Sequence, residues 1–208
     1  MFVLPIIIWI GTVINLHEVQ SMALKNDKIQ SDYQIATLGG GCFWCIEAVF
    51  EEVKGIVSVV SGYSGGVTKN PSYHEVCTGT TGHAEVVQIK FDPAIINYKE
   101  ILDIFFHTHD PTSLNKQGAD IGTQYRSVIF YHNMKQQAIA EEIIKELNAT
   151  RVYSKPIVTQ LEKFTAFYLA EEYHQEYFKK NPDAAYCNFV VKPKVDKLKK
   201  DYSEMLKR

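Results

Sequence analysis

The order of strand-like and helix-like segments is the feature that most constrains the fold of this chain. β-branched or alternating patterns predict four strands, over 33–39, 56–63, 84–92 and 125–132. A helix is predicted over 43–53, where Gly55 ends it, and a second one begins at Tyr98, where apolar residues recur at helical spacing. The resulting order, β-α-β-β-α-β, predicts an α/β (α+β) two-layer sandwich with a ferredoxin-like core.

The rest of the chain reads as an extension of this core. A helix over 134–147, a fifth strand over 157–162 and a short helix over 169–178 are predicted after the fourth strand. The connections 64–83 and 108–124 are predicted to be loops, and both are longer than usual, which is typical of functional loops. We therefore expect one domain over 33–192 whose long loops carry chemistry.

Both ends of the chain differ from this domain. The stretch from Phe2 to Ile14 has no charge and is shorter than the ~20 residues of a membrane span. Residues 1–25 are therefore interpreted as a signal-like or anchor-like segment, which favours an exported, periplasmic or membrane-anchored protein. An internal start at Met22 would instead give a cytoplasmic one.

The charge balance argues against nucleic-acid binding. The formal net charge is -2, whereas a nucleic-acid-binding surface needs a basic excess. The excess of lysine and arginine is confined to the end of the chain, where 193–208 is predicted to be a basic, solvated tail or helix face.

The segment GGGCFWCIE carries the strongest chemical signal. Cys42 lies where a strand meets a helix, and the glycines before it allow a sharp turn. Unpaired N–H groups at a helix start stabilise a thiolate, which predicts a lowered pKa and a reactive Cys42. The alternative is that Cys42 is a small buried hydrophobic residue.

The long loops supply polar groups that suit such a thiol. Glu85 begins a strand, and burial beside Cys42 would raise its pKa and make it a general acid. Asp120 and Tyr125 lie at another junction between loop and strand, and tyrosine hydroxyls bind oxygens that gain negative charge. A strand-end glutamate exposed to solvent is the simpler alternative for Glu85.

A zinc site is not expected. Cys42 and Cys45 have the spacing of half a zinc site, but the other half is missing. His107 and His109 are too close in sequence to supply it. We expect neither a metal nor an organic cofactor.

Four segments together resemble the A-type peptide methionine sulfoxide reductases. They are GGGCFWCIEAVF, SGYSGGVTKNPSYHEVCTGTTGHAEVVQIKFDP, HTHDPTSLNKQGADIGTQYRSVIFYH and AEEYHQEYFKKNP. The resemblance implies an α/β sandwich and reduction of methionine (S)-sulfoxide, free or in proteins, as a repair of oxidative damage.

The resemblance also implies the role of each site residue. Cys42 would attack the sulfoxide sulfur and become a sulfenic acid, while Glu85 would protonate the sulfoxide oxygen. The supporting residues would be Tyr73 and Tyr125 on that oxygen, Asp120 ordering the polar site, and Phe43 and Trp44 around the methyl group and sulfur.

A second thiol must resolve the sulfenic acid. Cys187 matches the family's C-terminal resolving position, while Cys45 is the alternative resolver or a relay. Cys77 is expected to be buried and structural. Thioredoxin or a similar dithiol protein would reduce the final disulfide. We expect the protein to be a monomer.

Two other classes of function compete with this interpretation. A general thiol–disulfide carrier would use Cys42 and Cys45 alone and would not need Glu85. A binding module would recognise oxidised methionine without forming methionine.

Overall fold

The structure is a computed structural model that describes residues 33–207. Its main sheet has the strand order β7-β6-β1-β3-β2-β8. The strands are β1 (Gln34–Gly39), β2 (Ile56–Ser64), β3 (Ala84–Phe91), β6 (Val128–Tyr131), β7 (Gln160–Lys163) and β8 (Phe167–Leu169). The mixed α/β fold expected from the sequence is confirmed, and the central strands β6, β1, β3 and β2 pair antiparallel.

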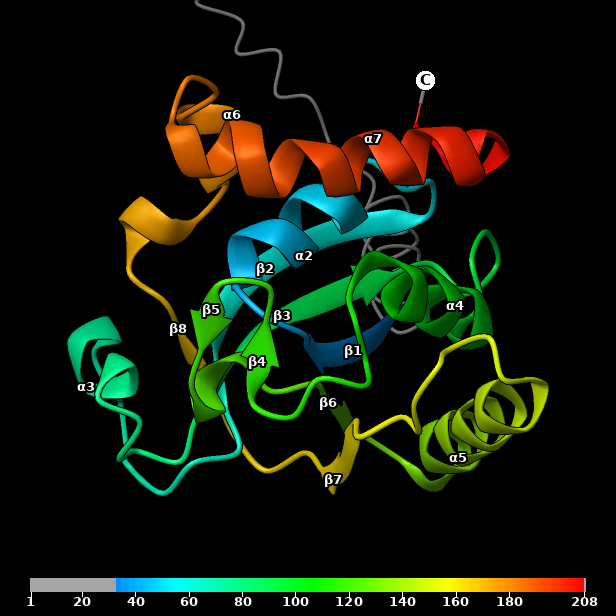
Figure 1. Ribbon diagram of the computed structural model, residues 1–208, viewed down its shortest axis with the longest axis horizontal. Coiled ribbons are helices and arrows are strands. Elements are labelled where there is room, and N and C mark those ends of the chain that lie inside the picture. The colour runs from blue at the N-terminus through cyan, green and yellow to red at the C-terminus, as the bar shows by residue number, and fades with distance from the viewer. Residues whose placement is uncertain (1–32, 208) are drawn as a thin grey trace, which may run out of the picture. The chain divides into compact units, whose positions relative to one another are not determined.

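In the view of Figure 1, helices lie above this sheet and to both sides of it. They are α2 (Phe43–Glu51), α3 (Tyr73–Cys77), α4 (Tyr98–Thr108), α5 (Met134–Thr150), α6 (Tyr177–Lys180) and α7 (Lys192–Asp201). The start of α4 shows why the sequence folds this way locally. Asn97 and Glu100 form a capping box, and the apolar stripe from Tyr98 to Phe106 is buried.

Several expected elements differ in detail. The loop 64–83 contains the short helix α3, which a capping box of Ser72 and Glu75 begins. The loop 108–124 contains the antiparallel strands β4 (Lys116–Gln117) and β5 (Asp120–Ile121). The helix expected over 169–178 is instead a 3₁₀ turn, Glu172–His174, followed by α6.

The lysine-rich C-terminal stretch is part of the packed fold. Helix α7 lies beside α2 (Figure 1), and its Val195 and Leu198 are buried. The backbone N–H of Lys54 donates to Met205 and that of Lys207 donates to Glu52. Residues 193–207 are therefore not a free tail: the lysines form the outer face of a helix and the apolar residues join the core.

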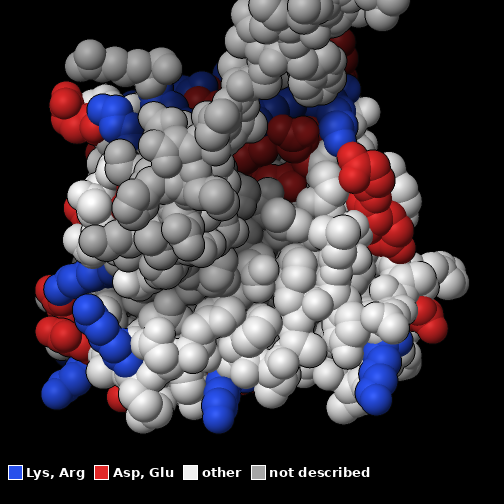
Figure 2. All heavy atoms as spheres, turned by 180° about the vertical axis from the view of Figure 1, so that it is seen from behind, with Lys and Arg blue, Asp and Glu red and all other residues white. Residues whose placement is uncertain are grey.

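The charged side chains on the face seen from behind are of both signs and scattered (Figure 2). The segment 1–25, interpreted above as a signal or anchor, lies outside the described residues. Among residues 33–207 no helix has the length and apolar character needed to cross a membrane.

Candidate active site

Cys42 lies at the turn between β1 and α2, as the sequence predicts. Gly41 has φ +91°, a conformation that side chains rarely adopt, and its N–H donates to the carbonyl of Tyr125 at 3.2 Å. A Cβ at Gly41 would lie 2.6 Å from the side chain of Gln117. The glycine thus lets the β4 segment close over the start of α2, where Cys42 is the N-cap residue.

The Cys42 thiol is more buried than the sequence suggested. Its residue is 7% exposed, and burial raises the pKa of Cys42 well above its ordinary value, with further increases from Glu85 and Cys45. The backbone N–H of Trp44 lowers the pKa of Cys42, but by less than burial raises it. The lowered pKa expected from the helix start is therefore wrong for this state, because loss of hydration outweighs the helix end.

Glu85 provides a buried carboxyl group next to this thiol. The residue is 1% exposed on β3, and its Oε2 accepts the N–H of Phe43 at 3.1 Å. Burial raises the pKa of Glu85 to about 8, although the Phe43 N–H and the Cys42 thiol lower it. At neutral pH the carboxyl therefore holds a proton within reach of Cys42.

Tyr186 belongs to the same cluster, although it is not among the predicted site residues. Its hydroxyl donates to Oδ2 of Asp120 at 2.7 Å. The same hydroxyl faces the thiols of Cys42 and Cys45 and lowers the pKa of each. Its position directly before Cys187 was the only sequence signal that pointed to it.

Tyr73 in α3 and Tyr125 in a 3₁₀ turn (Thr123–Tyr125) are half-buried near these groups. Burial raises the pKa of both hydroxyls, and the charge of Glu85 adds to both shifts. Both tyrosines therefore keep their protons and remain hydrogen-bond donors. Cys77, expected to be buried, is exposed, because it ends α3 at the surface with its thiol against the Tyr73 hydroxyl.

Aromatic rings form a wall beside Cys42. Phe43 is buried, and Trp44 is half-buried with its ring stacked on Tyr177 at 3.6 Å and 7°. The buried ring of His174 packs against the rings of Phe43 and Tyr73, with centroid distances of 5.0 Å and 4.4 Å. Tyr177 and His174 come from the segment AEEYHQEYF, in which no site residue was predicted.

Glu171 connects this segment to α3. Its Oε1 accepts the N–H of Tyr73 at 2.8 Å, and its Oε2 accepts the hydroxyl of Tyr63 at 2.9 Å. Tyr63 is fully buried in β2. One carboxylate therefore holds Tyr73 against the central sheet.

This contact predicts a stability effect. Glu171→Ala leaves the buried Tyr63 hydroxyl unpaired, so the free energy of unfolding should fall by about 1–3 kcal/mol. Urea unfolding measures the change. Glu172→Ala is the control, since the Glu172 side chain is 88% exposed and forms a surface ion pair with Lys180. An equal loss in both variants would contradict the assigned contact.

The two remaining thiols are placed differently. Cys45 is buried in the first turns of α2. Cys187 is fully buried in a π-helical turn, Cys187–Val191, that leads into α7. All four cysteines are free thiols in this structure.

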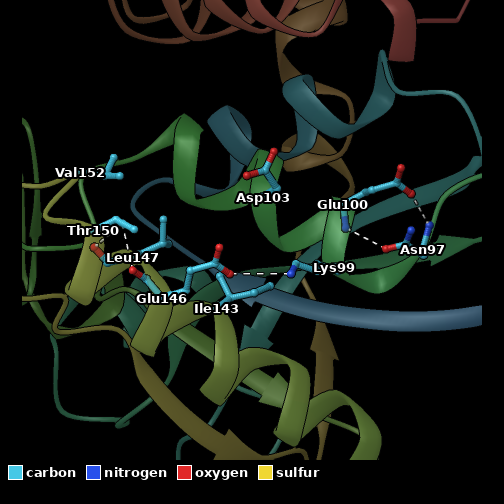
Figure 3. A pocket seen from close by; sticks show the side chains of 9 residues that line it. All are labelled: Asn97, Lys99, Glu100, Asp103, Ile143, Glu146, Leu147, Thr150 and Val152. Atoms are coloured by element: carbon cyan, nitrogen blue, oxygen red, sulfur yellow. Dashed lines mark hydrogen bonds and ion pairs between the residues drawn. The ribbon is translucent and has the colours of Figure 1, made fainter.

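A cleft between α4 and α5 lies apart from this cluster (Figure 3). It is bordered by Lys99 and Glu146, which form an ion pair of 3.7 Å across it. None of the predicted site residues lines it. The reactive groups are therefore gathered at the start of α2 and not in this cleft.

A buried thiol against a buried carboxylic acid is the pair of groups that a thiol-based oxidoreductase needs at one site. The family model "Peptide methionine sulfoxide reductase" matches residues 34–206. The chain belongs to the peptide methionine sulfoxide reductase family, and it is an enzyme that reduces methionine sulfoxide.

Named relatives and solved structures agree with this family assignment. A "Peptide methionine sulfoxide reductase MsrA" of Saccharolobus solfataricus is 56% identical over 84% of this chain and 97% of that protein. One of Leptospira borgpetersenii is 60% identical over 78% of this chain and 91% of that protein.

The structure of methionine sulfoxide reductase A of Corynebacterium diphtheriae matches with a TM-score of 0.70 and 35% identity, covering 74% of this chain and 77% of that one. Reduced Mxr1 from Saccharomyces cerevisiae matches with a TM-score of 0.69 and 36% identity, over 76% and 90%. Mxr1 in complex with Trx2 matches with a TM-score of 0.50 and 26% identity, over 71% and 86%.

Proposed function

We propose that Cys42 reduces the S-epimer of methionine sulfoxide, free or in proteins, with Glu85 as the proton donor. The observation that carries this proposal is the buried Glu85 carboxyl next to the buried Cys42 thiol. A sulfoxide oxygen leaves sulfur only after it is protonated. A protonated carboxyl and a thiol that can ionise are therefore needed at one place.

The first step conserves atoms and electrons. The Cys42 sulfur attacks the sulfoxide sulfur while Glu85 protonates the oxygen, and the oxygen is transferred to Cys42. The products are methionine and a Cys42 sulfenic acid, so sulfur in the substrate is reduced and sulfur in Cys42 is oxidised. The thiol proton returns the carboxyl to its protonated form.

Tyr73 and Tyr125 would bind the sulfoxide oxygen. Both hydroxyls stay protonated, and both lie within the electrostatic influence of Glu85. Asp120 would order this polar region through its bond with Tyr186. Hydrogen-bond donors aimed at an oxygen that gains charge stabilise the transition state.

Phe43 and Trp44 would hold the methyl group and sulfur of the substrate. The stack of Trp44 on Tyr177 fixes the indole ring, and Phe43 packs against His174. Polar donors on one side and aromatic rings on the other fix the placement of oxygen and methyl. Only one epimer then presents its sulfur to Cys42, and the family resemblance indicates the S-epimer.

Cys187 would resolve the sulfenic acid. Its thiol attacks the Cys42 sulfur, an S–S bond forms, the S–O bond breaks, and water leaves. Cys45 is the alternative, since it lies within the electrostatic influence of Cys42. A dithiol protein would then reduce the disulfide; a thioredoxin role is supported by the complex of Mxr1 with Trx2.

Epimer-resolved product analysis tests this function. With excess thioredoxin, thioredoxin reductase and NADPH, the protein should consume half of a racemic methionine sulfoxide peptide and leave the R-epimer. Consumption of both epimers at equal rates would overturn the assigned site geometry, and consumption of neither would overturn the proposed activity.

The resolving role predicts the behaviour of a second variant. Cys187→Ser should form methionine once per protein and then stop, because the sulfenic acid has lost its partner thiol. Turnover with thioredoxin should fall by about 10²-fold or more. Cys77→Ser is the control, since Cys77 is exposed on α3. Full turnover by Cys187→Ser would instead place the resolving role on Cys45.

A further inference from the structure

We propose that Tyr186 is a positioning residue that holds Cys187 away from Cys42 until Cys42 has been oxidised. The proposal rests on the resolving role proposed for Cys187. Tyr186 and Cys187 are consecutive residues. The backbone of one therefore cannot move far without moving the backbone of the other.

Tyr186 is held inside the active site of the reduced protein. Its hydroxyl donates to Asp120 at 2.7 Å and faces the Cys42 and Cys45 thiols. Its ring meets the edge of Trp44 at a centroid distance of 5.6 Å. Hydrogen bonds to carboxyl oxygens are among the stronger hydrogen bonds in proteins, so this tyrosine is firmly placed.

Cys187 is held by the part of the chain that follows Tyr186. It is fully buried in the turn Cys187–Val191, whose π-helical form is rare and is often found at functional sites. The turn continues into α7, where Pro193 lies in the first turn and Val195 is buried. A disulfide needs Cβ atoms about 4 Å apart, so the backbone of this segment must be placed closely against Cys42 before the bond forms.

Movement of Cys187 towards Cys42 requires the release of Tyr186. The Tyr186 hydroxyl bonds to Asp120 and to the Cys42 thiol, so it lies between them. In this proposal, the Cys187 thiol approaches Cys42 through that space. The sulfenic acid supplies the release. Its O–H is a new donor beside the Asp120 carboxylate and competes there with Tyr186.

The chemical step after release needs no further oxidant or reductant. The Cys187 sulfur bonds to the Cys42 sulfur, the Cys42 S–O bond breaks, and the oxygen leaves as water with the thiol proton. Oxidation of Cys42 thereby triggers the delivery of the thiol that consumes it. Before oxidation, the buried Cys187 is protected from reagents in solution.

Alkylation of Cys187 in the reduced protein tests the hold by Tyr186. We would treat the reduced protein with iodoacetamide, without substrate, and follow the Cys187 peptide by mass spectrometry. Tyr186→Phe removes the bond to Asp120 and should speed alkylation by about tenfold or more. A rate equal to that of the unsubstituted protein would overturn the proposal.

Tyr202→Phe is a matched control for this experiment. The Tyr202 hydroxyl donates to Asp103 at 2.8 Å, so it makes the same kind of bond beyond the other end of α7. Alkylation of Cys187 in Tyr202→Phe should stay close to that of the unsubstituted protein. An equal acceleration in both variants would mean general loosening of the C-terminal segment and would also overturn the proposal.

Hydrogen exchange tests the trigger without changing Tyr186. A variant with Cys45, Cys77 and Cys187 replaced by serine should retain the Cys42 sulfenic acid after one equivalent of sulfoxide. Amide exchange over 184–191 should then be about tenfold faster than before the substrate. Unchanged exchange with methionine formed would overturn the trigger alone, whereas absence of methionine would overturn the proposed activity that the trigger requires.

Discussion

Cys42→Ser is expected to reduce the first-turnover rate of methionine formation by about four orders of magnitude or more. The serine hydroxyl occupies the same N-cap position at the start of α2 but is a far weaker nucleophile than a thiolate. The serine hydroxyl also cannot form a stable counterpart of the sulfenic acid. The oxygen of the sulfoxide therefore has no group to accept it. Rapid-quench measurement of methionine, with protein in excess over substrate, gives the rate.

Two other cysteine variants are the controls for this prediction. Cys45→Ser and Cys77→Ser should both form the first methionine at a rate near that of the unsubstituted protein. Neither thiol has the direct contact with Glu85 that Cys42 has, although Cys45 is buried nearby. Loss of the first turnover in Cys45→Ser would favour a dithiol carrier over the proposed mechanism.

Glu85→Gln is expected to slow the first turnover by about 10²–10⁴-fold. The amide is almost the same size, and its oxygen can still accept the Phe43 N–H, so the local backbone should be unchanged. The amide has no acidic proton to give to the sulfoxide oxygen. A circular dichroism spectrum and a melting curve check the fold, and rapid-quench measurement gives the rate.

The pH dependence separates an acid from a merely structural carboxyl. Burial raises the pKa of Glu85 to about 8 and that of Cys42 well above its usual value, so the two groups titrate as a pair. The reactive form has one proton, on Glu85, and one thiolate, on Cys42.

The rate should therefore rise with pH as the pair loses its first proton and fall as it loses the second. Glu85→Gln has only the thiol to ionise, so its residual rate should rise with pH without a falling limb. A falling limb retained in Glu85→Gln would show that another group supplies the proton.

Local patterns predicted much of the fold. The order of strands and helices from 34 to 131 follows from period-two and helical spacing, and the structure has these elements in that order. The pieces that were missed are short. Helix α3 has five residues, and β4 and β5 have two each, which is too few for periodicity to be visible.

The site residues that were predicted lie in distinctive sequence segments. The features of the site that were missed depend on tertiary contacts. The burial of Cys42, which reverses the expected direction of its pKa shift, arises from elements packed over the start of α2. The bonds from Tyr186 to Asp120 and from Tyr73 to Glu171 join residues 66 and 98 positions apart. No local pattern in a single sequence specifies such pairs.

The most direct test of the account is one reaction with one equivalent of substrate. The reduced protein is mixed with a methionine (S)-sulfoxide peptide without any other reductant, and the thiols are then blocked. Methionine is quantified, and the disulfide is mapped by peptide mass spectrometry. The account predicts one methionine per protein and a bond between Cys42 and Cys187. Failure to form methionine, or methionine formed while Cys42 remains a free thiol, would contradict it.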